Sequence, residues 1–138
     1  PPPEVKPRFL ARIRSAQSAP APGWRSEPLT GEGRWVNLPV PGVRLRELTV
    51  DAERDIALLL VEMGRGAIFP DHTHSATERG LVLTGDVRMG ERLLGPGDFY
   101  EAAAGTRHEH IDSPSGCTGL LWVGAGAWRQ WRAAMAGA

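Results

Sequence analysis

The chain has 138 residues, enough for one domain with a hydrophobic core of its own. Sixteen basic residues balance sixteen acidic ones, which argues against a nucleic-acid partner, and no apolar run is long enough to cross a membrane. A single cysteine excludes an intrachain disulfide and a Cys-x-x-Cys zinc site, and it favours a reducing, cytoplasmic location.

Residues 1–33 have the composition of a linker with one short helix. Proline-rich runs at residues 1–3 and 19–23 resist regular structure. The apolar residues between these runs fall near helical spacing: Val5, Phe9, Leu10 and Ile13. This helix either docks on a neighbouring domain or packs on its own. Because the chain begins with three prolines and no initiator methionine, we expect a fragment of a longer protein or a processed product.

Residues 34–138 are predicted to form an all-β domain that ends in a helix. Short strands at regular spacing, parted by glycine and proline, are typical of a sandwich or barrel. The expected strands are 35–38, 43–50, 56–63, 67–74, 78–84, 87–89, 99–103, 107–111 and 117–123. Strand 56–63 is apolar on both faces, so we expect it to be buried.

The last residues change to a helical period. Trp128, Trp131 and Met135 recur at intervals of three and four, so residues 127–136 are predicted to form an amphipathic helix. Its tryptophans either pack on the barrel or contribute, with an apolar sheet face, to a homodimer interface.

All four histidines lie in two short segments, which makes them candidates for one metal site. His72 and His74 share a face if their segment is extended, because side chains two apart point the same way. Glu78 opens the next strand with the same parity, and His108 and His110 lie two apart on a later hairpin. Imidazole nitrogens with one carboxylate can bind Zn, Mn, Fe, Ni or Cu. The residues in phase with Glu78 are small and leave room inside a barrel: Gly80, Val82 and Thr84.

The spacing of the first cluster is more specific than its chemistry. The segment begins at Gly66, and five residues separate that glycine from His72-x-His74. Three residues then precede Glu78, and six more precede Gly85. This pattern resembles the first motif of the cupin superfamily at every position.

A second cupin motif is also present in a modified form. The similar segment begins at Gly97, and five residues separate that glycine from Ala103-x-Gly105. His108 follows after two more residues, and Ala103 stands in place of a proline. Asp112 stands where that motif has an asparagine.

The resemblance implies a jelly-roll barrel, the double-stranded β-helix of cupins. It also implies that His72, His74, Glu78 and His108 hold one divalent metal ion, with zinc expected ahead of Mn, Fe or Ni. His110 is a fifth ligand, a hydrogen-bond donor to a ligand or a polar group at the barrel mouth, and we favour the last two.

Other reactive residues have simpler interpretations. A thiol near a metal can be redox-active, but we favour a small core residue for Cys117. Four glutamates alternate with apolar or ligand positions and are interpreted as solvated: Glu62, Glu91, Glu101 and Glu109. We identify no catalytic residue, and no nucleotide-binding or nucleophile motif.

Within the superfamily, the chain resembles the ChrR-like cupins, which include the C-terminal domain of zinc-containing anti-sigma factors. The similar strings are residues 1–13, 59–67 with Pro70, and 94–99. The resemblance implies a zinc module that transmits a chemical stress signal. It also implies a sigma factor gripped mainly by an N-terminal domain that these residues do not include.

Two hypotheses follow for function. The first is a regulatory module that responds to an oxidant or to a small molecule bound in the barrel. The second is a small enzyme, such as a non-haem dioxygenase for a diketone, thiol or aromatic acid. The same ligands serve both, so they do not discriminate. We favour the regulator because of the proline-rich start and the helical segments.

The ligand set can be tested by single substitutions. His72→Ala or His74→Ala should abolish metal retention, because three remaining ligands hold an ion poorly, and Glu78→Ala should weaken it to a similar order. His110→Ala should weaken retention much less, as measured by metal content after gel filtration. Equal losses for His108→Ala and His110→Ala would show that the ligand set is wrong.

Overall fold

The computed structural model describes residues 22–29 and 33–136. The chain divides into two units, Pro1–Gly31 and Glu32–Ala138. In the described part of the first unit, Arg25 and Glu27 form an ion pair at 3.2 Å. The helix predicted near the N-terminus lies outside the described residues. The second unit carries the β-domain and the histidines.

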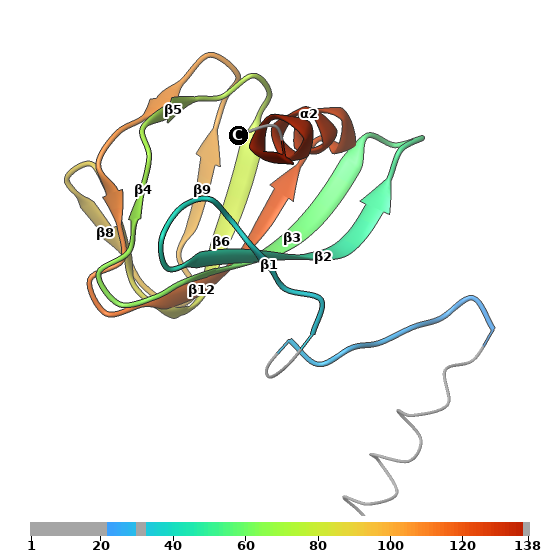
Figure 1. The fold of residues 1–138 in the computed structure, drawn as a ribbon, viewed down its shortest axis with the longest axis horizontal. Helices are drawn as coiled ribbons and strands as arrows, with labels where there is room; N and C mark the ends of the chain where they lie inside the picture. Colours follow the sequence, from blue (N-terminus) through green and yellow to red (C-terminus); the bar gives the residue numbers. More distant parts are fainter. Residues whose placement is uncertain (1–21, 30–32, 137–138) are drawn as a thin grey trace, which may run out of the picture. The chain divides into compact units, whose positions relative to one another are not determined.

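The second unit is built from antiparallel strands followed by a helix (Figure 1). Its larger sheet has the order β1-β2-β3-β12-β6-β9, so the last strand lies between strands from the first half of the domain. The bounds are β1 Val36–Asn37, β2 Val43–Asp51, β3 Ile56–Met63, β12 Cys117–Val123, β6 Glu78–Gly85 and β9 Phe99–Ala102.

A second sheet and a short ribbon complete the β-structure of the described residues. The second sheet has the order β4-β11-β7-β8, and the ribbon pairs β10 with β5. The bounds are β4 Ile68–Phe69, β11 Ile111–Asp112, β7 Val87–Met89, β8 Arg92–Leu94, β10 Arg107–His108 and β5 His72–Thr73. The helix α2 spans Ala125–Ala136.

Three predicted strands, β3, β7 and β12, have the expected bounds, and two predictions were wrong in detail. The expected strand 67–74 is split into β4 and β5 around Pro70, which has no N–H to donate to a ladder. The expected strand 107–111 is split into β10 and β11, because His110 has φ of 54°. His108 and His110 therefore do not share one extended strand. A strand that was not predicted, β8, pairs with β7 across the turn at Gly90.

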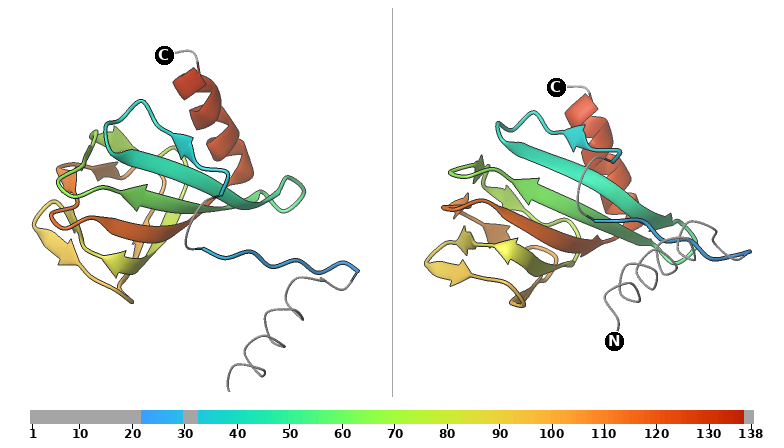
Figure 2. Two further views of the ribbon diagram at one scale, coloured as in Figure 1. Left: turned by 60° about the horizontal axis from the view of Figure 1, so that its bottom comes forward. Right: turned by 90° about the horizontal axis from the view of Figure 1, so that it is seen from below.

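The hydrophobic core takes residues from both sheets and from α2. Figure 2 shows α2 beside the larger sheet. The larger sheet contributes Leu45 and Leu59, which are 2% and 1% exposed. The second sheet contributes Val87 and Ile111, and α2 contributes Trp128. As predicted, β3 is buried and a helix tryptophan packs on the strands of the same chain.

Carboxylates from the β2–β3 hairpin hold α2 in place. Asp55 Oδ1 accepts the backbone N–H of Gly126 at 2.9 Å, so a negative charge lies at the helix N-terminus. Glu47 Oε1 accepts the indole N–H of Trp128 at 2.7 Å and an N–H of Arg132 at 2.5 Å. The helix is thus attached by directed bonds as well as by apolar packing.

Gly85 ends β6 where two backbones approach closely. Its φ is 72°, and an added Cβ would collide with the carbonyl of Gly116. Gly90 also has a positive φ, 60°, but an added Cβ there meets nothing within 4 Å. A comparison of the two glycines therefore distinguishes the free-energy cost of a positive φ from the cost of a steric collision.

We expect Gly90→Ala to lower the free energy of unfolding by about 1–2 kcal/mol, the cost of the left-handed conformation alone. Gly85→Ala should lower it by at least about 3 kcal/mol, because the backbone must also shift. Urea denaturation followed by tryptophan fluorescence would measure both. Equal losses of unfolding free energy in the two variants would show that the close approach of Gly116 does not contribute to the cost.

Candidate metal site

Two short strands bring the two histidine segments together. In the β5–β10 ribbon, His72 lies directly opposite His108. Side chains opposite each other on one face of an antiparallel pair are close neighbours. This pairing joins residues that lie on the two separate cupin-like motifs.

A turn places the third histidine. The N–H of His74 donates to the carbonyl of Thr106, and the N–H of Gly105 donates to the carbonyl of His74, both at 2.8 Å. The turn from Ala103 closes with a bond from Thr106 N to Ala103 O at 3.1 Å, and Gly105 has φ of 85°. Glycine at this position satisfies a type II turn, so the turn forms with Ala103 in place of proline.

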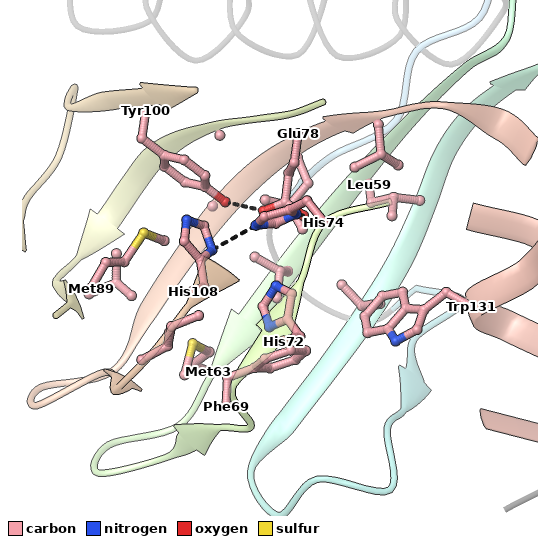
Figure 3. A pocket seen from close by; sticks show the side chains of 18 of the residues that line it. Leu59, Met63, Phe69, His72, His74, Glu78, Met89, Tyr100, His108 and Trp131 are labelled. Carbon is pink, nitrogen blue, oxygen red and sulfur yellow. Dashed lines mark hydrogen bonds and ion pairs between the residues drawn. The ribbon is translucent and has the colours of Figure 1, made fainter. Parts of the chain in front are cut away.

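His72, His74 and His108 form the cluster that could hold a metal ion (Figure 3). One nitrogen from each lies within 4.8 Å of the others. His74 Nε2 and His108 Nδ1 are 3.0 Å apart. Two bonds of about 2.05 Å that meet at about 90–110° place ligand nitrogens roughly 2.9–3.4 Å apart. The separation of these two nitrogens therefore fits two ligands of one ion.

A backbone carbonyl sets the tautomer of His72. Its Nδ1 lies 3.0 Å from the carbonyl oxygen of Pro70. A carbonyl only accepts, so Nδ1 carries the proton and Nε2 keeps a lone pair. Such a bond to the second ring nitrogen is the usual way in which proteins orient a metal-binding imidazole. Phe69 packs edge-on against the same ring, with centroids 5.4 Å apart.

The surroundings favour neutral imidazoles. Burial, and then the nearby His72, lower the pKa of His74 below its ordinary value. Burial and then His74 lower the pKa of His108, although Glu78 opposes the shift. Metal ions bind the neutral form, so these shifts reduce competition from protons.

Glu78 lies beside the cluster and has a partner of its own. Its Oε2 is 3.6 Å from His74 Nδ1, and its Oε1 accepts the hydroxyl of Tyr100 at 2.5 Å. Burial first, and then the charge of Glu78, raise the pKa of Tyr100 far above its usual range. The phenol therefore stays protonated and donates. Oε2 lies toward Nδ1 of His74, whereas Nε2 of the same ring is the nitrogen that approaches His108. Glu78 lies outside the three-histidine cluster, and its role as fourth ligand stays a prediction.

Tyr100 was not predicted as a site residue. It lies opposite Gly80 in the β6–β9 pair, and a Cβ on Gly80 would collide with its ring. The missing side chain of Gly80 is thus replaced by the tyrosine, which fills part of the room expected inside the barrel. A glycine inside a strand signals a close approach, but the partner strand cannot be read from that signal.

Other candidate residues lie outside the cluster. His110 is exposed, and its backbone N–H donates to Oδ1 of Asp71 at 2.9 Å. Cys117 belongs to the buried core, and burial raises the pKa of its thiol, which disfavours the reactive thiolate. Of the four glutamates expected to be solvated, Glu91 is exposed. The other three form ion pairs: Glu62 with Arg44, Glu101 with Arg79 and Glu109 with Arg107.

A cavity of about 360 Å³ opens beside the histidines. Its lining comes from both sheets and from α2, and most of it is apolar. The volume falls in the range of small-molecule sites. The histidine cluster therefore has room beside it for a molecule larger than water.

A family model described as the ChrR Cupin-like domain matches residues 29–127, more than half of the chain. The chain belongs to the ChrR cupin-like domain family. This assignment confirms the predicted resemblance and the cupin fold. Among the described residues, the ChrR-like cupin is mostly β-strand and has one C-terminal helix.

Solved structures support the same fold. A chain in the complex of Rhodobacter sphaeroides SigE with the anti-sigma ChrR is similar, with 28% identity and a TM-score of 0.59. The match covers 67% of this chain and 49% of that chain, so this chain spans about half the length of its match.

Two further structures are less similar in sequence. A putative acetylacetone dioxygenase from Methylibium petroleiphilum PM1 is 16% identical, with a TM-score of 0.58, and 72% of this chain and 80% of that chain are covered. An acetylacetone dioxygenase from Acinetobacter johnsonii is 12% identical, with a TM-score of 0.60 and coverage of 75% and 78%. At these identities the likeness concerns the fold alone. A comparison with curated proteins found no match.

Within the described residues, no helix has the length and apolarity needed to cross a membrane.

The lowered pKa values predict how the metal-free protein responds to acid. Below the ordinary value of 6.5, unfolded chains bind protons at His74 and His108 that the folded protein does not. The free energy of unfolding should therefore be highest above pH 6.5. It should decrease as the pH drops from 6.5 toward the lowered pKa values of the folded protein. Urea denaturation across pH 5–7.5 would measure this.

Matched variants locate the cause. His74→Gln should flatten the dependence, whereas His110→Gln, which changes an exposed imidazole, should leave it intact. A slope that persists in the double variant His74→Gln/His108→Gln would assign the effect to other groups.

Proposed function

We propose that this ChrR-like cupin is the metal-binding regulatory module of an anti-sigma factor, and that it controls transcription in response to an oxidant or a small molecule. In this proposal residues 1–33 are a linker and residues 34–138 are the module. The observation that carries the proposal is the cluster of His72, His74 and His108 in a member of this family.

The metal is zinc in this proposal. Three imidazoles with Glu78 as a fourth ligand are donors that zinc binds, and a fifth position on the ion would stay open to solvent or to a bound molecule. The tautomer of His72 and the spacing of His74 and His108 support this assignment. The hydroxyl of Tyr100 orients the carboxylate of Glu78 by holding one of its oxygens. The ion would act as a Lewis acid toward a bound molecule.

The partner is a sigma factor. A similar chain, ChrR, is crystallised with SigE, which supports a partner of this class here. By the family resemblance, the grip lies mainly in an N-terminal domain, and the cupin biases it. Such a regulator works in the cytoplasm.

A metal-dependent dioxygenase is the second candidate. The cavity beside the histidines favours it, because an enzyme needs room for its substrate at the metal. Three histidines without Glu78 would leave open positions for substrate and oxygen, with iron in place of zinc.

Metal analysis distinguishes the two functions. Protein purified without added metal should hold one zinc per chain and should consume no oxygen when it is reconstituted with iron and offered a small diketone. Elemental analysis and an oxygen electrode measure these outcomes. Tightly bound iron with turnover would overturn the regulatory proposal, and absence of any bound metal would overturn both.

A further inference from the structure

The cavity has two chemically different ends (Figure 3). At one end are the three histidines with Glu78 and Tyr100, and at the other is the side chain of Trp131 from α2. Leu59 and Phe69 lie between the histidines and Trp131, whereas Met63 and Met89 lie on the other side of the histidines. An occupant of the whole cavity would therefore meet polar groups at one end and apolar surface over the rest of its length.

The hydrogen-bonding groups at the polar end are already engaged. The Tyr100 hydroxyl is donated to Glu78, and the Nδ1 proton of His72 is donated to Pro70. A ligand gains little from these two donors, so a metal held by the histidines would be the strongest polar attraction at this end. A divalent ion with three neutral imidazoles and one carboxylate leaves a positive charge, which an anionic oxygen donor would neutralise. Burial of that anion is acceptable because it is paired.

The apolar end is shaped by aromatic rings. Trp131 packs on Phe69 with ring centroids 6.0 Å apart, and Phe69 packs on His72. Met135 of α2 lines the same end. Aromatic and thioether side chains offer wide, adaptable contact to an apolar ligand body. The aromatic contacts also connect the metal-binding histidine to α2.

The volume limits the size of the occupant. A cavity of about 150 Å³ holds benzene, so about 360 Å³ has room for roughly a dozen non-hydrogen atoms.

We propose that the cavity binds a small hydrophobic carboxylate, with its oxygens on the metal and its apolar body against Trp131. This inference rests on the proposed function, because the metal of that site anchors the ligand. It adds the chemical class of the molecule to which the module responds, and it identifies α2 as the element that the ligand contacts.

The probe is 4-phenylbutanoate, which has about a dozen non-hydrogen atoms. The zinc-loaded full chain should bind this probe at one saturable site, as measured by calorimetry. Binding should also change the tryptophan fluorescence. Metal-free protein should bind it at least tenfold more weakly. Acetate, which has only the carboxylate, and 4-phenylbutan-1-ol, which lacks it, should each bind at least tenfold more weakly.

Paired tryptophan variants test the contact with α2. Trp131→Ala should retain zinc, lose the fluorescence response and weaken binding about tenfold. Trp122→Ala should bind like the wild type, because Trp122 is 46% exposed and lies outside the cavity lining. If Trp131→Ala does not fold, Trp131→Phe keeps most of the apolar surface and should still lose the fluorescence response.

The outcomes separate this inference from the proposed function. Zinc-loaded protein that fails to bind the probe, or that binds it no better than metal-free protein, would overturn the inference and leave the zinc module standing. Equal effects of the Trp131→Ala and Trp122→Ala variants would overturn the contact with α2. Protein that holds no zinc would overturn the proposed function and the inference together.

Discussion

The site depends on the pairing of β5 with β10. These strands are two residues each, too short to be stable by themselves, yet they place His72 opposite His108. The bonds between His74 and the turn that ends at Thr106 extend the pairing and bring in the third imidazole. The backbone of this ribbon, more than any contact between side chains, makes one cluster from two distant segments.

The apolar interior gives the cluster its chemistry. Burial lowers the pKa of His74 and of His108, which favours their neutral forms, and a carbonyl selects the tautomer of His72. The protonated hydroxyl of Tyr100 donates to Glu78 in this setting. The hydroxyl of Tyr100 and the Nδ1 proton of His72 thus have acceptors, as buried donors require. The same interior leaves a cavity, so a cluster that could hold an ion has room beside it for a small molecule.

The helix α2 links this interior to the surface. Trp131 faces the cavity, while Trp128 and Arg132 on the same helix bond Glu47 of β2. A ligand that presses on Trp131 acts on a helix that is attached to the strands by bonds to Glu47 and Asp55 and by the packing of Trp128. A regulator needs such an element, because occupancy of the barrel must be reported outside it. A dioxygenase would use the same wall only to position its substrate.

Local patterns in the sequence determined the all-β class, the strands β3, β7 and β12, the C-terminal helix and the three clustered histidines, because periodicity and residue spacing are encoded along the chain. The split of strand 107–111 at His110, the pairing of Gly80 with Tyr100 and the place of Trp131 beside the site were not predicted. These depend on which strands become neighbours and on the backbone conformation that their packing imposes. A ring can fill the space above a glycine only after β6 and β9 are paired, so tertiary structure alone decided the shape of the cavity and the partner of Glu78.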